Sequence, residues 1–178
     1  MTLYMAFLRG INVGGNHIVR MADLKRTLEE AGMRRVQTYI QSGNILFESD
    51  ETASELETRF ERLLETTFGF PMPTMIRSAE EMKEIMRRCP YSFAELTEGQ
   101  SIHLSLLKRE LSEAVIAAIP ELDTGGDEYR IDGRELYWFF NQSMLDSKLP
   151  KKLQKIGPAT MRNWKTIIKM DELATARV

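Results

Sequence analysis

The sequence has one cysteine, two histidines and no long uninterrupted apolar run, and each shortage excludes a class of protein. With Cys89 alone, no disulfide can form within the chain, so nothing favours an oxidising compartment. No window approaches the roughly 18 apolar residues that a membrane helix needs. Residues 1–9 lack a cationic segment followed by a long apolar stretch, so we expect no signal peptide and no membrane association. The expected location is the cytoplasm.

Net charge is also small, since 24 Lys and Arg stand against 26 Asp and Glu, giving a formal net charge of −2. This balance argues against a protein that coats nucleic acid along its whole surface, but it allows a local basic site. Hydrophobic residues make up 43% of the chain and charged residues 28%, which is ordinary for a globular protein. The 178 residues can form one large domain or two small ones.

The first half of the chain, residues 1–92, predicts the order β-α-β-β-α-β followed by a helix, which is the ferredoxin-like arrangement. The expected elements are a strand at Leu3–Leu8, a helix at Met21–Ala31, a hairpin at Val36–Ser49, a helix at about Ala53–Phe68, a strand at Met72–Arg77 and a helix that Ser78 caps and Pro90 ends. A hairpin turn at Ser42-Gly43 would pair Ile40 with Ile45 and place both on the core face with Val36 and Phe47.

After a connector at Pro90–Gln100 the pattern starts again. We expect a strand at Ile102–Leu107, a helix that Ser112 caps and Pro120 closes, a hairpin at Glu128–Phe140, a helix at Asp146–Ile156 and a last helix from about Met161 to Ala174, capped by Thr160. In the hairpin, a turn at Asp132-Gly133 would pair Arg130 with Glu135. This half, residues 98–178, ends in a helix where a fourth strand would be expected. We interpret the chain as an α+β structural duplication; periodicity does not separate this from one continuous sheet.

The loop Gly10–Asn16 (GINVGGN) can present consecutive backbone N–H groups to an anion at Gly14 and Gly15. Arg9, Asn12 and Asn16 supply side-chain donors around it. The spacing is neither that of a Walker A loop nor that of a dinucleotide fingerprint. A glycine loop between a strand and a helix is more often a plain turn, so both interpretations stay open.

The segment from Ser147 to Met170 is basic and contains no acidic residue. Its cations are Lys148, Lys151, Lys152, Lys155, Arg162, Lys165 and Lys169. The segment is either a solvated face, a complement to the acidic stretch Glu48–Glu65 of another subunit, or a positive surface for phosphate or carboxylate. At the expected helix start, Trp164 shares an apolar stripe and belongs to the core, whereas Arg162, Asn163 and Thr166 can face a ligand.

No catalytic constellation stands out. No Cys/His/Asp cluster has the spacing of metal ligands, so we expect no metal site, and no serine stands in a nucleophile-elbow context. His103 is expected to be packed in the core, and Cys89 to be a buried, inert thiol. No cofactor is implied.

Three separated motifs resemble those of a bacterial family of unknown function. They are FLRGINVGG at Phe7–Gly15, TYIQSGN at Thr38–Asn44 and TMRNWKT at Thr160–Thr166, and the family pattern has Leu where Phe7 stands. The resemblance implies a two-part α+β fold with ferredoxin-like halves and implies no activity. It also marks which polar residues belong to the motifs: Arg9, Asn12, Asn16, Ser42, Asn44, Arg162, Asn163 and Thr166.

Three functional hypotheses follow from these observations. In the first, the protein binds an anion, such as a nucleotide, a phosphorylated metabolite or a nucleic-acid backbone, in a cleft between its halves where Arg9 and Arg162 converge. The expected ligand-binding residues are Arg9, Asn12, Gly14, Gly15, Asn16, Ser42, Asn44, Lys148, Arg162, Asn163, Thr166 and Lys169. In the second, the basic C-terminal face docks an acidic partner, including a second copy of the chain. An enzyme acting on a phosphorylated small molecule is a third possibility, for which no residue is an evident base or nucleophile.

Overall fold

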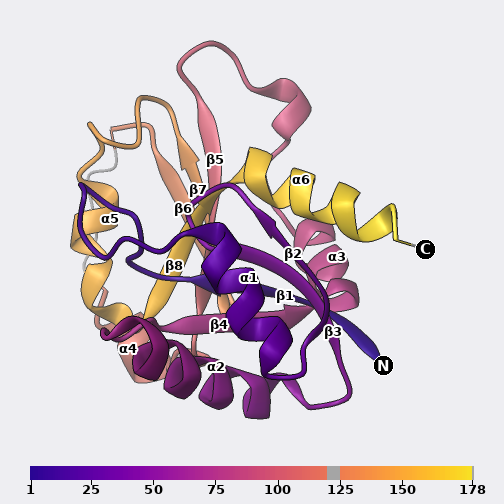
Figure 1. The fold of residues 1–178 in the computed structure, drawn as a ribbon. Helices are drawn as coiled ribbons and strands as arrows, with labels where there is room; N and C mark the ends of the chain where they lie inside the picture. Colours follow the sequence, from indigo (N-terminus) through magenta and orange to yellow (C-terminus); the bar gives the residue numbers. More distant parts are fainter. Residues whose placement is uncertain (120–124, 178) are drawn as a thin grey trace. The chain divides into compact units, whose positions relative to one another are not determined.

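The computed structural model describes residues 1–119 and 125–177 and contains two four-stranded antiparallel sheets (Figure 1). The chain divides into two compact units, which we call unit 1 (residues 1–84 and 169–178) and unit 2 (residues 85–168). The predicted division into residues 1–92 and 98–178 stays a prediction.

Unit 1 contains the first sheet, in the strand order β2-β3-β1-β4. Along the chain, its elements are β1 (Thr2–Leu8), α1 (Met21–Glu30), β2 (Arg34–Tyr39), β3 (Asn44–Ser49), α2 (Ala53–Phe68), β4 (Thr74–Ser78) and the start of α3 (Ala79–Arg87). Ser78 and Glu81 form the predicted capping box, because each backbone N–H donates to the other side chain at 3.1 Å. The end of the last helix, α6 (Trp164–Thr175), also belongs to this unit.

The core of unit 1 lies between the sheet and helices α1 and α2, which cover the same face (Figure 1). Leu24 and Leu28 come from α1, and Phe60 comes from α2; all three are fully buried. Two carboxylates of α2 also reach the sheet. Glu57 accepts a hydrogen bond from the backbone N–H of Ile76 at 2.8 Å, and Glu61 accepts one from Thr74 at 3.3 Å. These bonds satisfy donors on the outer edge of β4, which is otherwise open to strand pairing.

Unit 2 repeats the same strand order as β6-β7-β5-β8. Its elements are β5 (Ser101–Leu107), α4 (Glu113–Ala117), β6 (Glu128–Asp132), β7 (Glu135–Phe140), α5 (Leu149–Lys152), β8 (Ala159–Asn163) and the start of α6, with short 3-10 turns η1 (Phe93–Glu95) and η2 (Gln154–Ile156). One core cluster gathers Trp138 and Phe140 of β7 with Leu149 and Leu153. The indole N–H of Trp138 donates to Ser105 Oγ at 2.9 Å. The prediction of two ferredoxin-like halves is confirmed.

The prediction that the second half lacks a fourth strand is wrong. Residues Ala159–Asn163 form β8 and pair with β5, so α6 begins at Trp164 and Thr160 lies within the strand rather than at a helix cap. The two buried residues of this strand are Thr160 and Arg162, so no alternation of apolar residues reveals it. The helical spacing of Met161, Trp164 and Ile168 obscured the strand further.

Both predicted hairpins exist, but their registers differ from the predictions. In the first hairpin Tyr39 pairs with Asn44, so the loop is four residues long. Ile40 is half exposed in this loop and does not join the core face. In the second hairpin Asp132 pairs with Glu135, so the two-residue turn is Gly133-Arg134. Gly133 has φ +61°, and Arg134 is not among the residues with positive φ, which fits a type II′ turn with glycine first.

Helices α4 and α5 correspond to two of the helices predicted for unit 2. Ser112 caps α4 as predicted, since its Oγ accepts a bond from the N–H of Val115 at 3.2 Å, whereas Pro120 lies outside the described residues. The helix predicted at Asp146–Ile156 is shorter, because Pro150 stands in the first turn of α5, where proline starts a helix. Nowhere in residues 1–119 and 125–177 is a helix long and apolar enough to cross a membrane.

Candidate functional site

The side chain of Asn12 joins the loop after β1 to the β2–β3 loop through hydrogen bonds. Its Nδ2 donates to the carbonyl oxygens of Val19 at 3.0 Å and Gln41 at 2.7 Å, and its Oδ1 accepts from the N–H of Val19 at 2.8 Å. Asn12 has φ +53°, a conformation that asparagine tolerates better than most residues. We call residues 9–20 and 40–43 together the loop surface of unit 1.

Gly14 and Gly15 form the tip of a small hairpin within the loop surface. The N–H of Asn16 donates to Val13 O, and that of Asn12 donates to His17 O, both at 3.0 Å. The two glycines have φ +58° and +76°, as a type I′ turn requires. Both are exposed, and neither of their N–H groups donates to another residue in the described part of the chain. The tip therefore presents two adjacent backbone donors to solvent.

Gly43 and Asn44 of the second motif hold the loop surface through hydrogen bonds on its buried side. The N–H of Leu8 donates to Gly43 O at 2.9 Å, and a Cβ atom on Gly43 would lie only 2.8 Å from the Cβ of Leu8. Asn44 is fully buried, and its Nδ2 donates to Tyr39 O at 3.1 Å and to Ser42 Oγ at 2.8 Å. These motif residues fix the shape of the two loops.

A stacked pair of rings anchors the far side of the same loop. The imidazole of His17 lies against the ring of Phe70, with 4.1 Å between centroids and 9° between planes. Its Nδ1 lies 3.3 Å from Gly10 O, and the backbone of His17 has φ +49°. Because His17 is held on both sides, it belongs to the scaffold of the loop.

The outer side of the loop surface is apolar and basic. Val13, Ile18 and Ile40 are 65%, 61% and 50% exposed. Ile40 also has φ +47°, which a β-branched residue adopts only at a cost of about 1–3 kcal/mol, and such strain gathers at functional sites. Arg9 and Arg20 are exposed, and neither forms an ion pair with any described residue. Residues 9–20 and 40–43 include no acidic residue.

Sequence reasoning missed Arg20 and the three exposed aliphatic side chains. Arg20 directly precedes α1 and looks like an ordinary surface cation at that position. The sequence pattern placed Ile40 on the core face of the hairpin and assigned no role to Val13 or Ile18. Only their positions on loops, at 50% exposure or more, mark them as surface groups.

In unit 2, three predicted site residues lie together where β8 passes into α6. Arg162 is buried, and its Nη1 donates to Thr160 Oγ1 at 2.6 Å and to Met161 O at 3.0 Å. Burial lowers the pKa of Arg162 to about 10. Asn163 Oδ1 accepts from the N–H of Lys165 at 2.9 Å and so caps α6, on which Thr166 is half-buried.

The two predicted lysines are both exposed. Lys148 is exposed immediately before α5 of unit 2. Lys169 is exposed on the part of α6 that belongs to unit 1, with Nζ 3.8 Å from a carboxylate oxygen of Glu172. Arg9 lies in unit 1 and Arg162 in unit 2, so the predicted convergence of these two arginines stays a prediction.

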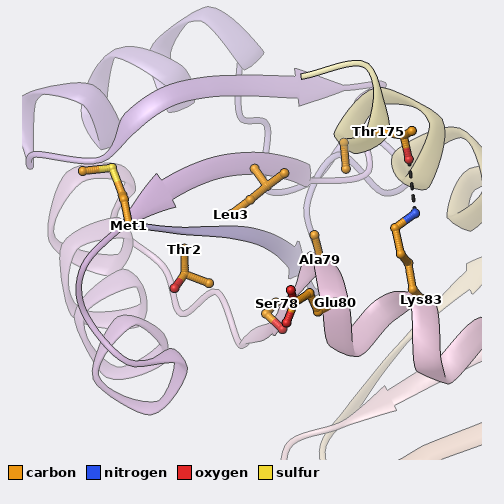
Figure 2. Close-up of a pocket in the computed structure, with 9 residues that line it drawn as sticks. Met1, Thr2, Leu3, Ser78, Ala79, Glu80, Lys83 and Thr175 are labelled. Atoms are coloured by element: carbon orange, nitrogen blue, oxygen red, sulfur yellow. Dashed lines mark hydrogen bonds between the residues drawn. The ribbon is translucent and has the colours of Figure 1, made fainter. Parts of the chain in front are cut away.

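A separate hollow of about 440 Å³ in unit 1 lies beside the start of β1, the start of α3 and the end of α6 (Figure 2). Its lining includes Leu3, Ala79, Lys83 and Ala174. The ammonium group of Lys83 donates to Asp171 at 3.0 Å and to Thr175 Oγ1 at 3.2 Å. Because the lysine is occupied in joining α3 to α6, this hollow offers no available cation and remains a mainly apolar depression.

Groups for metal or thiol chemistry do not assemble around the loop surface. Among the described residues, no three His, Cys, Asp or Glu side chains are placed to hold a metal ion. Cys89 is half-buried, burial raises its pKa, and its Sγ lies 3.5 Å from Tyr91 O, which fits an unreactive thiol.

Comparison with known proteins places the chain in a family. Residues 1–137 match the family described as "Protein of unknown function (DUF1697)", a range that ends before the third motif at Thr160–Thr166. The fold is similar to that of a conserved bacterial protein, SP0830, from Streptococcus pneumoniae. The two share 26% sequence identity with a TM-score of 0.80, over 96% of this chain and 97% of that chain. No curated protein matches the sequence. The chain belongs to the DUF1697 family.

Proposed function

We propose that the protein binds a phosphate-bearing ligand at the loop surface of unit 1. The observation that carries the proposal is a pair of exposed arginines, Arg9 and Arg20, that flank a rigid, acid-free loop with the exposed N–H groups of Gly14 and Gly15 at its tip. Guanidinium groups and paired backbone donors are the groups that proteins use for phosphate oxygens. A pre-formed loop also spares the ligand the cost of ordering it.

The exposed aliphatic side chains narrow the class of ligand. Val13, Ile18 and Ile40 supply apolar contact beside the cations, which an inorganic anion would not use. A nucleotide combines a phosphate group with a flat aromatic base whose faces pack against aliphatic side chains, and so fits both features. We therefore assign the loop surface to a nucleotide or a closely similar phosphorylated metabolite.

The test is a titration with a nucleoside monophosphate, followed by backbone amide NMR. The amide signals of Gly14 and Gly15 should shift in a saturable manner, because their N–H groups meet the phosphate. In Arg9→Gln or Arg20→Gln the dissociation constant should rise at least tenfold, since one charge-assisted hydrogen bond is worth about 1.5–3 kcal/mol.

Arg62→Gln is the matched control for this titration. It removes one exposed arginine of unit 1 from α2, away from the loop surface, and should leave the affinity unchanged. If all three variants weaken binding equally, only the net charge of the protein attracts the ligand, and the proposed site is wrong. Saturable binding that leaves Gly14 and Gly15 unshifted also contradicts it.

A second function, docking of an acidic macromolecule on unit 2, has one observation in its favour. Leu145 is 86% exposed, and Lys148, Lys151 and Lys152 beside it are exposed without an ion pair to any described residue. The loop before Lys148 is held by the fully buried Asp127. Its carboxylate accepts hydrogen bonds from the N–H of Asn141 and from Ser147 Oγ, both at 2.7 Å.

The acidic stretch of a second copy is a poor partner for that surface. All of its carboxylates except that of the exposed Glu65 are already used within unit 1: Glu48 binds Arg35, Asp50 binds the amino terminus, Glu51 binds Arg59, Glu55 caps α2, and Glu57 and Glu61 bind β4. Sedimentation of the wild type and of Lys151→Gln/Lys152→Gln decides the point. A dimer that the double variant dissociates would support self-association, and two identical monomers would exclude it.

A further inference from the structure

Three cations that are distant in sequence line one hollow of unit 1. Lys25 of α1, Arg35 of β2 and Arg177, which follows α6, surround a hollow of about 530 Å³ together with Val36, Gln37 and Thr38. No acidic residue lines it. We call this hollow the Arg177 pocket. Its lining residues all belong to unit 1.

Arg177 contributes a guanidinium nitrogen that is buried and unsatisfied. Nη2 donates to Gln37 Oε1 at 3.3 Å, whereas Nη1 is buried and has no hydrogen-bond partner among the described residues. Burial is the larger cause, and the nearby Arg35 charge the second, of a lowered pKa for Arg177. A buried N–H group without an acceptor is rare in proteins, because the lost hydrogen bond costs free energy.

The backbone at Arg35 departs from a regular strand. Arg35 has φ +49°, and the register of β2 against β3 shifts between Arg34 and Gln37, which is the mark of a β-bulge. Bulges on edge strands re-aim side chains, and β2 is an edge strand of its sheet. The strain places a second cation beside Arg177 in spite of their mutual repulsion.

The lining of the pocket carries three cationic side chains and no acidic one. One carboxylate is near: Glu48 lies 3.4 Å from Nη1 of Arg35 and partly offsets the repulsion on Arg177. Lys25 and Arg177 form no ion pair with any residue in the described ranges. These four described side chains together carry a net positive charge, which a dianion neutralises.

We propose that the Arg177 pocket is an anion-binding site that takes a terminal phosphate group. A phosphate monoester is a dianion with three acceptor oxygens, one for each of the three cations. The guanidinium forks of Arg35 and Arg177 suit such oxygens, and the anion supplies the acceptor that Nη1 of Arg177 lacks.

This site is separate from the loop surface. Arg35 lies near the start of β2 and Ile40 lies in the loop that follows β2; the five-residue step between them spans at most about 17 Å of extended chain. A ligand in one place therefore leaves the other exposed. Failure of either proposal does not entail failure of the other, because the amide signals of Gln37 and Thr38 report on the pocket and those of Gly14 and Gly15 on the loop surface.

The experiment is an amide NMR titration of the whole chain with inorganic phosphate at constant ionic strength, maintained with sodium chloride. The amide signals of Val36, Gln37 and Thr38 should move in a saturable manner. Arg177→Gln should raise the dissociation constant at least tenfold, and Lys25→Gln should raise it several-fold. Arg62→Gln again removes an arginine elsewhere in unit 1 and should have no effect. Thermal unfolding of each variant verifies that it is folded.

A second comparison identifies the kind of phosphate. Methyl phosphate, a monoester, should bind at least tenfold more tightly than dimethyl phosphate, a monoanionic diester, because only the first matches the charge of the pocket. Equal affinity for the two would overturn the assignment to a terminal phosphate. Absence of saturable shifts at Val36, Gln37 and Thr38, or equal weakening by Arg177→Gln and Arg62→Gln, would overturn the site itself.

Discussion

Arg77 and Arg162 occupy the same position in the two halves of the chain. Arg77 pairs with Met5 of β1, and Arg162 pairs with Leu104 of β5. Each arginine is buried, and each donates from Nη1 to the carbonyl oxygen of the preceding residue, at 3.2 Å and 3.0 Å respectively. The residue after each arginine, Ser78 or Asn163, caps the following helix.

The main-chain bonds around the first strand of each half repeat in the same way. The N–H groups of Arg9 and Lys108 donate to Pro73 O and Pro158 O, both at 3.0 Å. The equivalence explains the RNW motif in structural terms. A buried arginine followed by a helix cap is what the end of the fourth strand requires in either half, so Arg162 does not need a ligand to account for it.

Gly43 should tolerate alanine far less well than Gly14. Both have positive φ, which costs an alanine about 1–2 kcal/mol. At Gly43 the added Cβ also meets Leu8 at 2.8 Å and Ile11 at 3.0 Å, and overpacking costs about 1–3 kcal/mol more. At Gly14 nothing lies within 4 Å. Denaturant unfolding of Gly43→Ala and Gly14→Ala measures the difference. Equal losses in the free energy of unfolding would contradict the close approach of Gly43 to Leu8.

Stability should fall as the pH drops below about 6.5, in part because of His103. Burial lowers the pKa of His103 from 6.5 to about 4, so below pH 6.5 the unfolded chain binds a proton that the folded chain does not. The contribution of the neutral, buried His103 to the free energy of unfolding is complete above pH 6.5 and is lost as the pH falls toward 4. It amounts to about 3 kcal/mol, at about 1.4 kcal/mol for each pKa unit.

The measurement is the free energy of unfolding between pH 7.5 and 4.5. His103→Gln should reduce its dependence on pH. A pH profile unchanged in His103→Gln would show that this imidazole is accessible to protons in the folded state.

Trp164 should act as a packing residue. It is 6% exposed at the start of α6, which confirms the prediction that it belongs to the core. Trp164→Ala should cost about 3–5 kcal/mol of the free energy of unfolding, and Trp164→Phe, which retains a ring, should cost less. A Trp164→Ala protein that keeps its melting temperature would show that the side chain contributes no packing.

Limited proteolysis should first cut the connector at Pro90–Gln100. Ser92 to Glu95 and Thr97 to Gly99 are exposed, and the backbone bonds of residues 95, 96 and 100 are local. Such segments are the usual sites of nicking. Mass spectrometry of the earliest fragments locates the cut; a first cut inside residues 36–49 would contradict the predicted boundary.

Sequence alone determined the elements whose signals are local. The capping box at Ser78, the limits of α2, the cap at Ser112 and the existence of both hairpins all follow from residues within a few positions of one another. Local signals also indicated a turn at Gly14 and Gly15, because glycine alone adopts positive φ without cost.

The tertiary structure decided the rest, because the deciding contacts join residues far apart in the chain. Strand β8 is recognised by its partner β5 and not by its own pattern, since its buried residues are Thr160 and Arg162. The four-residue loop of the first hairpin is held by distant residues, since Asn12 donates to Gln41 O and the N–H of Leu8 donates to Gly43 O. Lys25, Arg35 and Arg177 look like ordinary surface cations in sequence. The fold of unit 1 places them around one hollow, and this arrangement, with the unsatisfied guanidinium nitrogen of Arg177, is the basis of the proposed anion site.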